Sequence, residues 1–384
     1  MNRSVTVIGG GGIGLSIALE MAQRGVETSV IQRDPSSDIT SWSAAGILPP
    51  ARLEQALDPL DRLRGFSHQL YPEWIAQLES TTGVDCGFRK CGGWYLATSP
   101  GERAAMVGMT GYWKELGISC HAVSEHELAE REPSLTSWSK GAEASSAWWV
   151  PNEWQIRPPH LLRALRTACQ SSGVKFRDRT EVVDIATNDG QPHLLVGGNW
   201  EKCDQVVLSA GAWSGKIARN LGMEKSVIPI RGQMLLLKTP SSLLTSVVNV
   251  GHRYLVPRDD GYLLVGSCEE EVGFEQGTTS DMLESLRQFA VSLIPELKSA
   301  ESVSHWSGIR PMTFDGFPMI GRVPNESSIY VAAGHFRSGW HLAPATAKCL
   351  VALMLGEKPA VDLIAFGAGK KQICGDAPTH SYMR

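Results

Sequence analysis

The sequence lacks the features that would place it in several large classes of protein. No run of 18 apolar residues occurs, so we expect no transmembrane helix and no membrane partner. Basic residues (36) do not exceed acidic residues (40), and no run of five basic residues occurs, which argues against a nucleic-acid partner. These absences leave a small molecule as the expected partner.

Cysteine is sparse and shows no metal-binding pattern. The eight cysteines form no CxxC pair, and none lies near paired histidines at the spacing of a zinc site, so no metal is predicted. Scattered cysteines in a chain of this length are typical of reduced, buried packing residues. The first residues already have the pattern of a strand and a turn, so we expect no cleavable signal peptide and a cytoplasmic location.

The chain alternates two kinds of pattern. Its 384 residues are 42% hydrophobic and 20% charged, which is ordinary for a globular protein long enough for two domains. Apolar runs at both ends and near residue 206 predict buried parallel strands. Short apolar runs between residues 229 and 268, separated by turn residues, predict antiparallel strands. Apolar spacing predicts helices over residues 62–82, 101–116, 158–171, 281–293 and 343–355.

A glycine-rich turn follows the first expected strand, residues 5–8. Gly9, Gly11 and Gly14 match the dinucleotide-binding fingerprint. The first glycine allows a tight turn, the second lets the backbone approach a pyrophosphate, and the third lets helix and strand pack closely. The helix that follows would present free N–H groups to the phosphates. The position between a strand and a helix favours a dinucleotide site over a turn that binds nothing.

The residue expected to bind the ribose is not acidic. An aspartate or glutamate usually stands about 20 residues after the turn, but Gln32 occupies this place and Arg33 follows. Gln32 could bond a ribose hydroxyl without a charge-assisted bond. Arg33 could instead bind the 2′-phosphate of NADP, or be a solvated surface residue. We favour Gln32 on an unphosphorylated ribose.

A lone arginine marks a candidate substrate site. Arg310 is the only fixed positive charge between residues 305 and 321. An arginine in apolar surroundings needs an anion, and guanidinium binds a carboxylate through two parallel hydrogen bonds. We predict that Arg310 holds a substrate carboxylate, with an ion pair to Asp315 as the structural alternative. Arg337 and Tyr254 are further candidates, although such a tyrosine often only packs.

Residues 334–355 favour a flavin over a nicotinamide. Gly334 and Gly339 allow the backbone to approach a planar ring. A helix starting near Ala343 would direct its N-terminus toward the pyrimidine edge of that ring. His335 and His341 are candidates for acid or base work, but hydride transfer to a flavin need not use one, so no general base is assigned.

Several motifs together resemble the D-amino acid oxidase and glycine oxidase family of flavoproteins. The similarity covers about residues 3–366 and is carried, in order, by residues 40–48, 206–214, 254–258, 265–267, 308–311, 315–321 and 333–339. The motifs are most similar to those of glycine oxidases, which supply glycine imine for the thiazole of thiamine.

This resemblance implies residues for both ligands. Arg310 and Arg337 would touch the substrate, and Tyr254 would close its pocket. FAD contacts are implied at Gly12, Ile13, Gln32, Arg33, Thr40, Ser41, Ala45, Gly46, Ile47, Val182 (near the adenine), and His335, Phe336, Arg337, Ser338, Gly339, Trp340 and His341 (beside the ring). The sequence departs from the family at Gln32, where an acid is usual, and at Trp340–His341, where two aliphatic residues are common.

The predicted fold class is α/β and discontinuous in sequence. A Rossmann-like FAD-binding domain is expected to comprise residues 1–83, 147–228 and 306–366, and a second, mostly antiparallel substrate domain residues 84–146 and 229–305. Residues 367–384 are expected to form a polar, disordered tail.

The implied activity is FAD-dependent oxidation of a small amino acid such as glycine, sarcosine or a small D-amino acid. Oxygen would be the acceptor and hydrogen peroxide the product, and the family also allows a homo-oligomer. Three alternatives stay open. The chain could be a D-amino acid dehydrogenase that passes electrons to a quinone or other carrier. It could be a sarcosine oxidase-like enzyme with cysteine-linked flavin, although neither Cys268 nor Cys349 matches that site. It could also be a non-catalytic dinucleotide-binding module.

Overall fold

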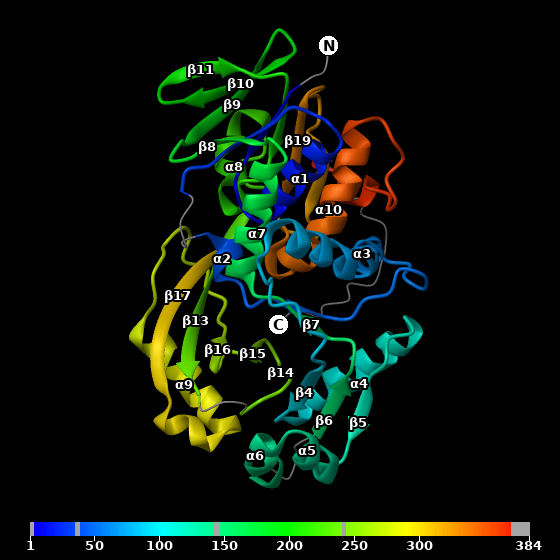
Figure 1. The fold of residues 1–384 in the computed structure, drawn as a ribbon, viewed down its shortest axis with the longest axis vertical. Helices are drawn as coiled ribbons and strands as arrows, with labels where there is room; N and C mark the ends of the chain where they lie inside the picture. The colour runs from blue at the N-terminus through cyan, green and yellow to red at the C-terminus, as the bar shows by residue number, and fades with distance from the viewer. Residues whose placement is uncertain (1–3, 35–38, 142–145, 240–242, 370–384) are drawn as a thin grey trace.

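The N-terminal strand lies inside a six-stranded, mostly parallel sheet. β1 (Val5–Ile8) pairs in parallel with β2 (Thr28–Ile31) and with β12 (Gln205–Leu208). The computed structural model describes residues 4–34, 39–141, 146–239 and 243–369, and in it the strand order is β18-β19-β12-β1-β2-β8 (Figure 1). The remaining strands are β8 (Lys175–Arg177), β18 (Met319–Arg322) and β19 (Ile329–Ala333), and β18 runs antiparallel to β19. The α/β fold class is confirmed.

The two faces of this sheet are covered differently. Alternate residues of a strand point to opposite faces. Val207 of β12 packs into a core with four helices, whereas Val206 and Leu208 pack into a separate core on the other face. The helices are α1 (Gly12–Gln23), α3 (Pro59–Thr82), α7 (Pro158–Ser171) and α10 (Gly339–Met354). The other face is covered by the short α8 (Ser214–Ile217) and an antiparallel sheet of β9 (Val182–Asn188), β10 (Gln191–Val196) and β11 (Asn199–Lys202).

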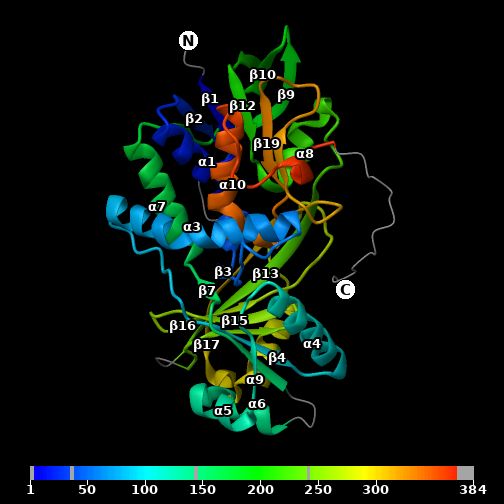
Figure 2. The ribbon, with the colours of Figure 1, turned by 90° about the vertical axis from the view of Figure 1, so that its right-hand side faces the viewer.

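A second, eight-stranded sheet forms the other half of the molecule (Figure 2). Its order is β17-β13-β16-β15-β14-β4-β6-β5, with antiparallel neighbours except for β14 and β4. Its strands are β4 (Gly93–Ala97), β5 (His121–Val123), β6 (Ser146–Val150), β13 (Ile228–Lys238), β14 (Val247–Val250), β15 (Arg253–Pro257), β16 (Tyr262–Gly266) and β17 (Glu301–Met312). β6 and β17 carry this sheet beyond residues 146 and 305, where the substrate segments were expected to end.

Helices cover both faces of the larger sheet. Trp94 and Leu96 of β4 share a core with α5 (Glu125–Arg131), α6 (Thr136–Gly141) and α9 (Ser280–Leu293). Tyr95, which points the other way, packs edge-on against Trp113 of α4 (Pro100–Glu115). Two short connections, β3 (Ile47–Leu48) and β7 (Trp154–Gln155), pair with each other between the two large sheets. No helix in the described ranges is long and apolar enough to cross a membrane.

The long helix α3 (Pro59–Thr82) crosses the middle of the molecule between the two sheets (Figures 1 and 2). It begins where the Asp58 side chain accepts hydrogen bonds from two backbone N–H groups, and it ends at Gly83 in the left-handed conformation. The apolar spacing predicted residues 62–82, which is three residues short at the start and correct at the end.

The last helix starts earlier than the sequence predicts. We expected a start near Ala343 beside Pro344, but α10 begins at Gly339 and contains Pro344. A proline inside a helix leaves the carbonyl four residues before it without an N–H partner. Here that carbonyl belongs to Trp340, and the Tyr71 hydroxyl of α3 donates to it instead. A contact between distant segments therefore permits the additional turn.

The C-terminal prediction can be followed only in part. Residues 367–369 form a turn after the last short helix, and residues 370–384 of the predicted tail, with Cys374, lie outside the described residues. The other seven cysteines are free, and four of them are buried.

A buried carboxyl group in the turn after β6 links β4 and β14 of the larger half. Glu153 is fully buried and accepts hydrogen bonds from the Tyr95 hydroxyl and, at 2.8 Å, from the Asn249 amide. Gly93 permits this approach, because a Cβ there would lie 2.4 Å from a Glu153 carboxyl oxygen. Burial raises the pKa of Glu153 to about 7, although the two hydrogen bonds favour the charged form.

We predict that Glu153 makes the protein less stable as pH rises from 4.5 to about 7. The folded state retains this proton between pH 4.5 and about 7, where the unfolded chain loses it, so the free energy of unfolding should fall as pH rises through this window. The fall amounts to roughly 3 kcal/mol at most. Urea unfolding between pH 4 and 9 should show it in the wild type and in an exposed control, Glu130→Gln, but not in Glu153→Gln. Equal pH dependence in all three proteins would contradict the assignment.

Candidate cofactor and substrate site

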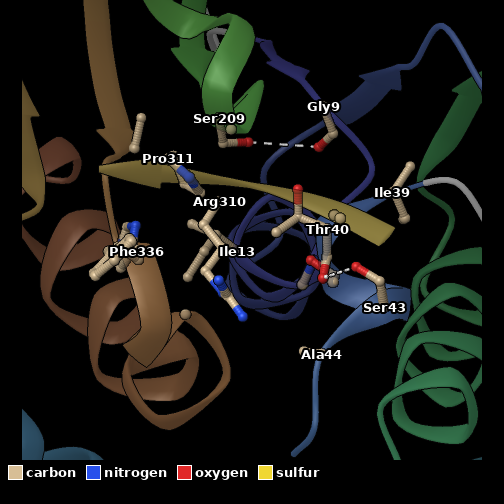
Figure 3. Close-up of a pocket in the computed structure, with 18 of the residues that line it drawn as sticks. Gly9, Ile13, Ile39, Thr40, Ser43, Ala44, Ser209, Arg310, Pro311 and Phe336 are labelled. Atoms are coloured by element: carbon tan, nitrogen blue, oxygen red, sulfur yellow. Dashed lines mark hydrogen bonds between the residues drawn. The ribbon is translucent and has the colours of Figure 1, made fainter. Parts of the chain in front are cut away.

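A single cavity of about 840 Å³ is bounded by both large sheets. From the parallel half it receives the glycine turn and the ends of β2, β12 and β19, and from the other half β13, β15 and β17. Figure 3 shows Gly9 and Ile13 from the turn, Thr40 and Ser43 from α2 (Thr40–Ser43), and Arg310 from β17 around this space. All the residues proposed from sequence except Gly14 line the cavity.

The glycine turn is shaped by backbone contacts. Gly9 has a φ of +112°, and a Cβ on it would lie 2.4 Å from the carbonyl oxygen of Ser209. A Cβ on Gly14 would lie 1.9 Å from the carbonyl oxygen of Gly9, which explains why Gly14 packs beneath the turn without lining the cavity. Gly11 is the N-cap of α1 and has no side chain that could accept from the backbone N–H groups, although the Ser41 hydroxyl accepts from the N–H of Gly12. A helix N-terminus that faces a cavity fits a pyrophosphate.

Gln32 is held in one orientation by a residue that sequence reasoning missed. Its amide nitrogen donates to a carboxyl oxygen of Asp178 at 2.5 Å, and Arg166 donates to the other oxygen at 2.5 Å. Because a carboxylate only accepts, the Gln32 amide oxygen must point the other way. It lies against the glycine turn, 1.7 Å from the place of a Cβ on Gly10. Although burial raises the pKa of Asp178, the bonds from Arg166 and Gln32 outweigh it and keep the pKa low.

Arg33 stands beside the cavity with partners of its own. Its guanidinium lies 4.6 Å from the ring centroid of Trp213, and it is 3.9 Å from the Glu181 carboxylate. Both partners also line the cavity, as does the predicted adenine contact Val182. A carboxylate beside Arg33 disfavours the 2′-phosphate of NADP, the alternative that the sequence left open.

The segment after β2 is tied to the larger sheet. The Thr40 hydroxyl donates to the Ile309 carbonyl at 2.6 Å, and the Trp306 indole donates to the Ser43 carbonyl at 3.1 Å. The Ala45 carbonyl accepts from Arg258 at 2.6 Å. These bonds hold residues 40–47 against the cavity, and Ser41 receives the backbone N–H of Gly12 at 2.8 Å.

Arg258 was not singled out in the sequence, although it ends one of the motifs. It donates to the carbonyls of Ala45 and Ile156 and to the Gln155 amide oxygen. Burial lowers the pKa of this guanidinium to about 10, still far above neutrality. It therefore fixes the backbone beside Gly46 and Ile47 as a charged donor.

The residues after β19 present neutral imidazoles. Burial lowers the pKa of His335 to about 3, and its Nε2 lies 3.1 Å from the Thr346 hydroxyl. Burial also lowers the pKa of His341, whose ring lies edge-on to His68 with centroids 5.9 Å apart. Trp340, the other departure from the family, packs its ring on Gly12 and donates to the Ser41 carbonyl at 2.8 Å.

Arg310 faces the cavity with neutral partners only. Its guanidinium donates to the Cys268 carbonyl at 2.9 Å and the Ser267 hydroxyl at 2.7 Å. It lies over Gly232 of β13, where a Cβ would be 2.3 Å from a guanidinium nitrogen. No ion pair joins it to a carboxylate in the described part of the chain, and Asp315 instead accepts from the Phe317 N–H in its own turn.

The other two substrate candidates have defined partners. Tyr254 on β15 is buried, and its hydroxyl lies 3.4 Å from the Met234 sulfur. Arg337 donates to the Glu269 carboxylate and to the His252 carbonyl, both at 2.9 Å. Both residues line the same cavity as Arg310. No cysteine is found among the described residues around it, so Cys268 and Cys349 offer no attachment point there.

A glycine turn at the head of a parallel sheet, open to a cavity closed by a second sheet, defines a two-part dinucleotide-dependent oxidoreductase. A family model described as FAD-dependent oxidoreductase (DAO) matches residues 4–353, and the chain belongs to this family. The predicted FAD cofactor and enzyme class are thereby confirmed.

Three similar proteins span nearly the whole chain. Glycine oxidase of Pseudomonas putida is 32% identical over 373 residues, covering 94% of this chain and 97% of the relative. The bifunctional protein ThiO/ThiG of Trichormus variabilis is 31% identical over 93% of this chain, which matches 53% of that longer protein. The crystal structure of glycine oxidase from Geobacillus kaustophilus superposes with a TM-score of 0.89 at 30% identity, covering 96% of this chain and 99% of that one.

We predict that Asp178 makes Gln32 a better residue here than the acid usual in the family. Gln32→Glu would set a second carboxylate against Asp178, and the repulsion should raise the dissociation constant of FAD about tenfold. The double variant Gln32→Glu/Asp178→Asn should regain affinity, because the new amide can donate to Glu. The fluorescence of FAD released on dilution measures the dissociation constants of the single and the double variant. Asp189→Asn, at an exposed position, is the charge control. Tighter FAD binding by Gln32→Glu alone would contradict this coupling.

Proposed function

We propose that this protein oxidises the amine of a small amino acid, with FAD as the cofactor and oxygen as the acceptor. The observation that carries the proposal is Arg310, a guanidinium without a carboxylate partner in the described chain, facing the cavity that the glycine turn also lines. An uncompensated cation in a partly closed cavity is suited to an anionic ligand. Glycine, sarcosine and small D-amino acids all present a carboxylate next to the amine.

The surroundings of Arg310 favour two parallel hydrogen bonds from its guanidinium to that carboxylate. A guanidinium has five N–H donors, and Ser267 and Cys268 take one each. Gly232 lets the planar group lie flat against β13, so its orientation is fixed before the substrate arrives. Tyr254 would close the pocket beside the carboxylate, and Arg337 would stand at the other side of the same space.

The FAD contacts that we propose follow the cavity from the adenine end to the ring. Val182 would meet the adenine, the Gln32 oxygen the ribose, and the α1 N-terminus the pyrophosphate. Beside the ring we propose Thr40, Ser41, Ala45, Gly46, Ile47 and the residues from His335 to His341. When bound, FAD would supply the acceptor for the two electrons of the amine oxidation and the route by which they reach oxygen. The low pKa of His335 keeps an additional positive charge out of this region.

The relatives support the substrate class and the acceptor. The glycine oxidase names support an oxidase of small amino acids, in which the imine product is hydrolysed to an oxo acid and ammonia. The fused ThiO/ThiG relatives support the link to thiamine that the motifs suggested. A cytoplasmic location, a homo-oligomeric state and the absence of nucleic-acid and membrane partners stay predictions from sequence.

We predict that Arg310 acts mainly on substrate affinity. Arg310→Ala should raise KM roughly 10- to 100-fold, since a hydrogen-bonded charge contributes about 1.5–3 kcal/mol, and it should leave FAD bound. Arg310→Lys should give an intermediate KM because it retains charge but not the two-bond geometry. Steady-state kinetics and the flavin absorbance spectrum measure these effects. An unchanged KM in Arg310→Ala would remove the carboxylate role.

Two measurements test the reaction itself. Under nitrogen, glycine, sarcosine or D-alanine should bleach the flavin absorbance, and no bleaching by any amino acid would favour the non-catalytic alternative. Under air, each substrate oxidised should give about one hydrogen peroxide. Bleaching under nitrogen without peroxide under air would identify a dehydrogenase that needs a quinone or another carrier.

A further inference from the structure

Four consecutive residues after β16 hold three arginines. Ser267 and Cys268 accept hydrogen bonds from Arg310 through a hydroxyl and a carbonyl oxygen. Each of the two residues that follow pairs its carboxylate with an arginine: Glu269 with Arg337 and Glu270 with Arg231. The segment 267–270 therefore decides which of these three arginines retains an uncompensated charge.

The ion pair between Arg231 and Glu270 lies outside the cavity lining and uses both carboxylate oxygens. Arg231 is buried and bonds both oxygens of Glu270, at 3.0 and 3.1 Å. The hydrogen bond from Arg231 is the main cause that lowers the pKa of Glu270 to about 2. Arg231 is not among the residues that line the cavity. This pair is structural and adds no net charge to the site.

The pair between Arg337 and Glu269 lies at the cavity itself. The side chains are 33% and 40% exposed, and they meet at 2.9 Å. Arg337 has a second anchor, the His252 carbonyl at 2.9 Å, and His252 also lines the cavity. Loss of the Glu269 charge would therefore leave Arg337 in place as a further uncompensated cation at the cavity that Arg310 also lines.

We propose that Glu269 restricts the substrate to amino acids with a single anionic group. This inference rests on the proposed amino acid oxidation and names the substrate class. Glu269 neutralises Arg337, whereas Arg310 keeps neutral partners and is left to bind a carboxylate. Arg253 also lines the cavity, but it is held by hydrogen bonds to Ser285 and lies over the Phe289 ring. A second carboxylate placed at Arg337 would meet the negative charge of Glu269. Glu269 thus acts through charge, as a specificity determinant that excludes dianions.

The test compares two substrates that differ by one carboxylate. Sarcosine carries an N-methyl group where iminodiacetate carries an N-carboxymethyl group. In the holoenzyme Glu269→Gln, the kcat/KM ratio of iminodiacetate to sarcosine should rise about three- to tenfold, mainly through KM, as expected for one partly exposed charge. Glu269→Asp, which retains the charge, should behave like the wild type, and high salt should shrink the difference.

A matched control separates local from general charge effects. Glu271→Gln removes the same charge from an exposed residue two positions further along. The ratio should not change in this variant. An equal rise in Glu271→Gln, no rise in Glu269→Gln, or a wild type that prefers iminodiacetate to sarcosine would each overturn the proposal.

A binding measurement tests the inference apart from turnover. Acetate and malonate are a monoanion and a dianion that cannot be oxidised as amines, and their binding can be followed through the flavin absorbance spectrum. Glu269→Gln should tighten malonate relative to acetate by a similar factor, even if no amino acid is oxidised. Failure of turnover with this shift present would reject the proposed function alone, whereas absence of the shift would reject the role of Glu269.

Discussion

The close approach of β1, α1 and β12 at the glycine turn is the constraint on which the site depends. The atoms that crowd the Cβ positions of Gly9 and Gly14 are backbone carbonyls, so no side-chain rotation could make room there. Only with these two positions bare can α1 start close to the strand ends and leave its N-terminus open. The parallel strand order around β1 then places the ends of β2, β12 and β19 along one edge.

The second sheet completes this edge through bonds from several short segments. Thr40 and Ser43 bond β17, and Ala45 bonds Arg258 of the turn after β15. The backbone of residues 40–46 is thereby shared between the two halves. β17 runs beside the same segment at Gly308. Arg310 follows two residues later on β17, and its guanidinium lies over Gly232 of β13. Arg310 and the glycine turn are thus positioned relative to each other by hydrogen bonds as well as by apolar packing.

Much of the fold could be predicted from the sequence because its signals are local. The fingerprint around Gly9 and the spacing of α7, observed with the same bounds of 158–171, depend on residues next to one another. The start of α10 could not be predicted, since the carbonyl that Pro344 leaves without an N–H partner belongs to Trp340 and is bonded by Tyr71, 269 residues before Trp340. Arg310 was found because it is alone in its segment. Gly232, on which the Arg310 guanidinium lies, was not found, because the pairing of β13 with β17 creates that contact.

The partners of charged side chains were the least predictable part. Gln32 looked like an imperfect ribose residue until Asp178, 146 positions further on, explained its orientation. Arg337 resembled a second carboxylate binder, and nothing near it in sequence indicated that Glu269 would neutralise it. Such pairs connect segments far apart in the chain, and their effect on function depends on charge balance in three dimensions.

A cavity bounded by both halves has a thermodynamic consequence for studies of this protein. Because residues from both sheets meet the same space, a ligand bound there favours the folded arrangement of both at once. Folding and FAD binding are then linked equilibria, and the free energy of unfolding rises with the logarithm of the free FAD concentration. A substitution that only weakens FAD binding will thus lower the observed melting temperature. Stabilities of variants become comparable when free FAD is held fixed or saturating.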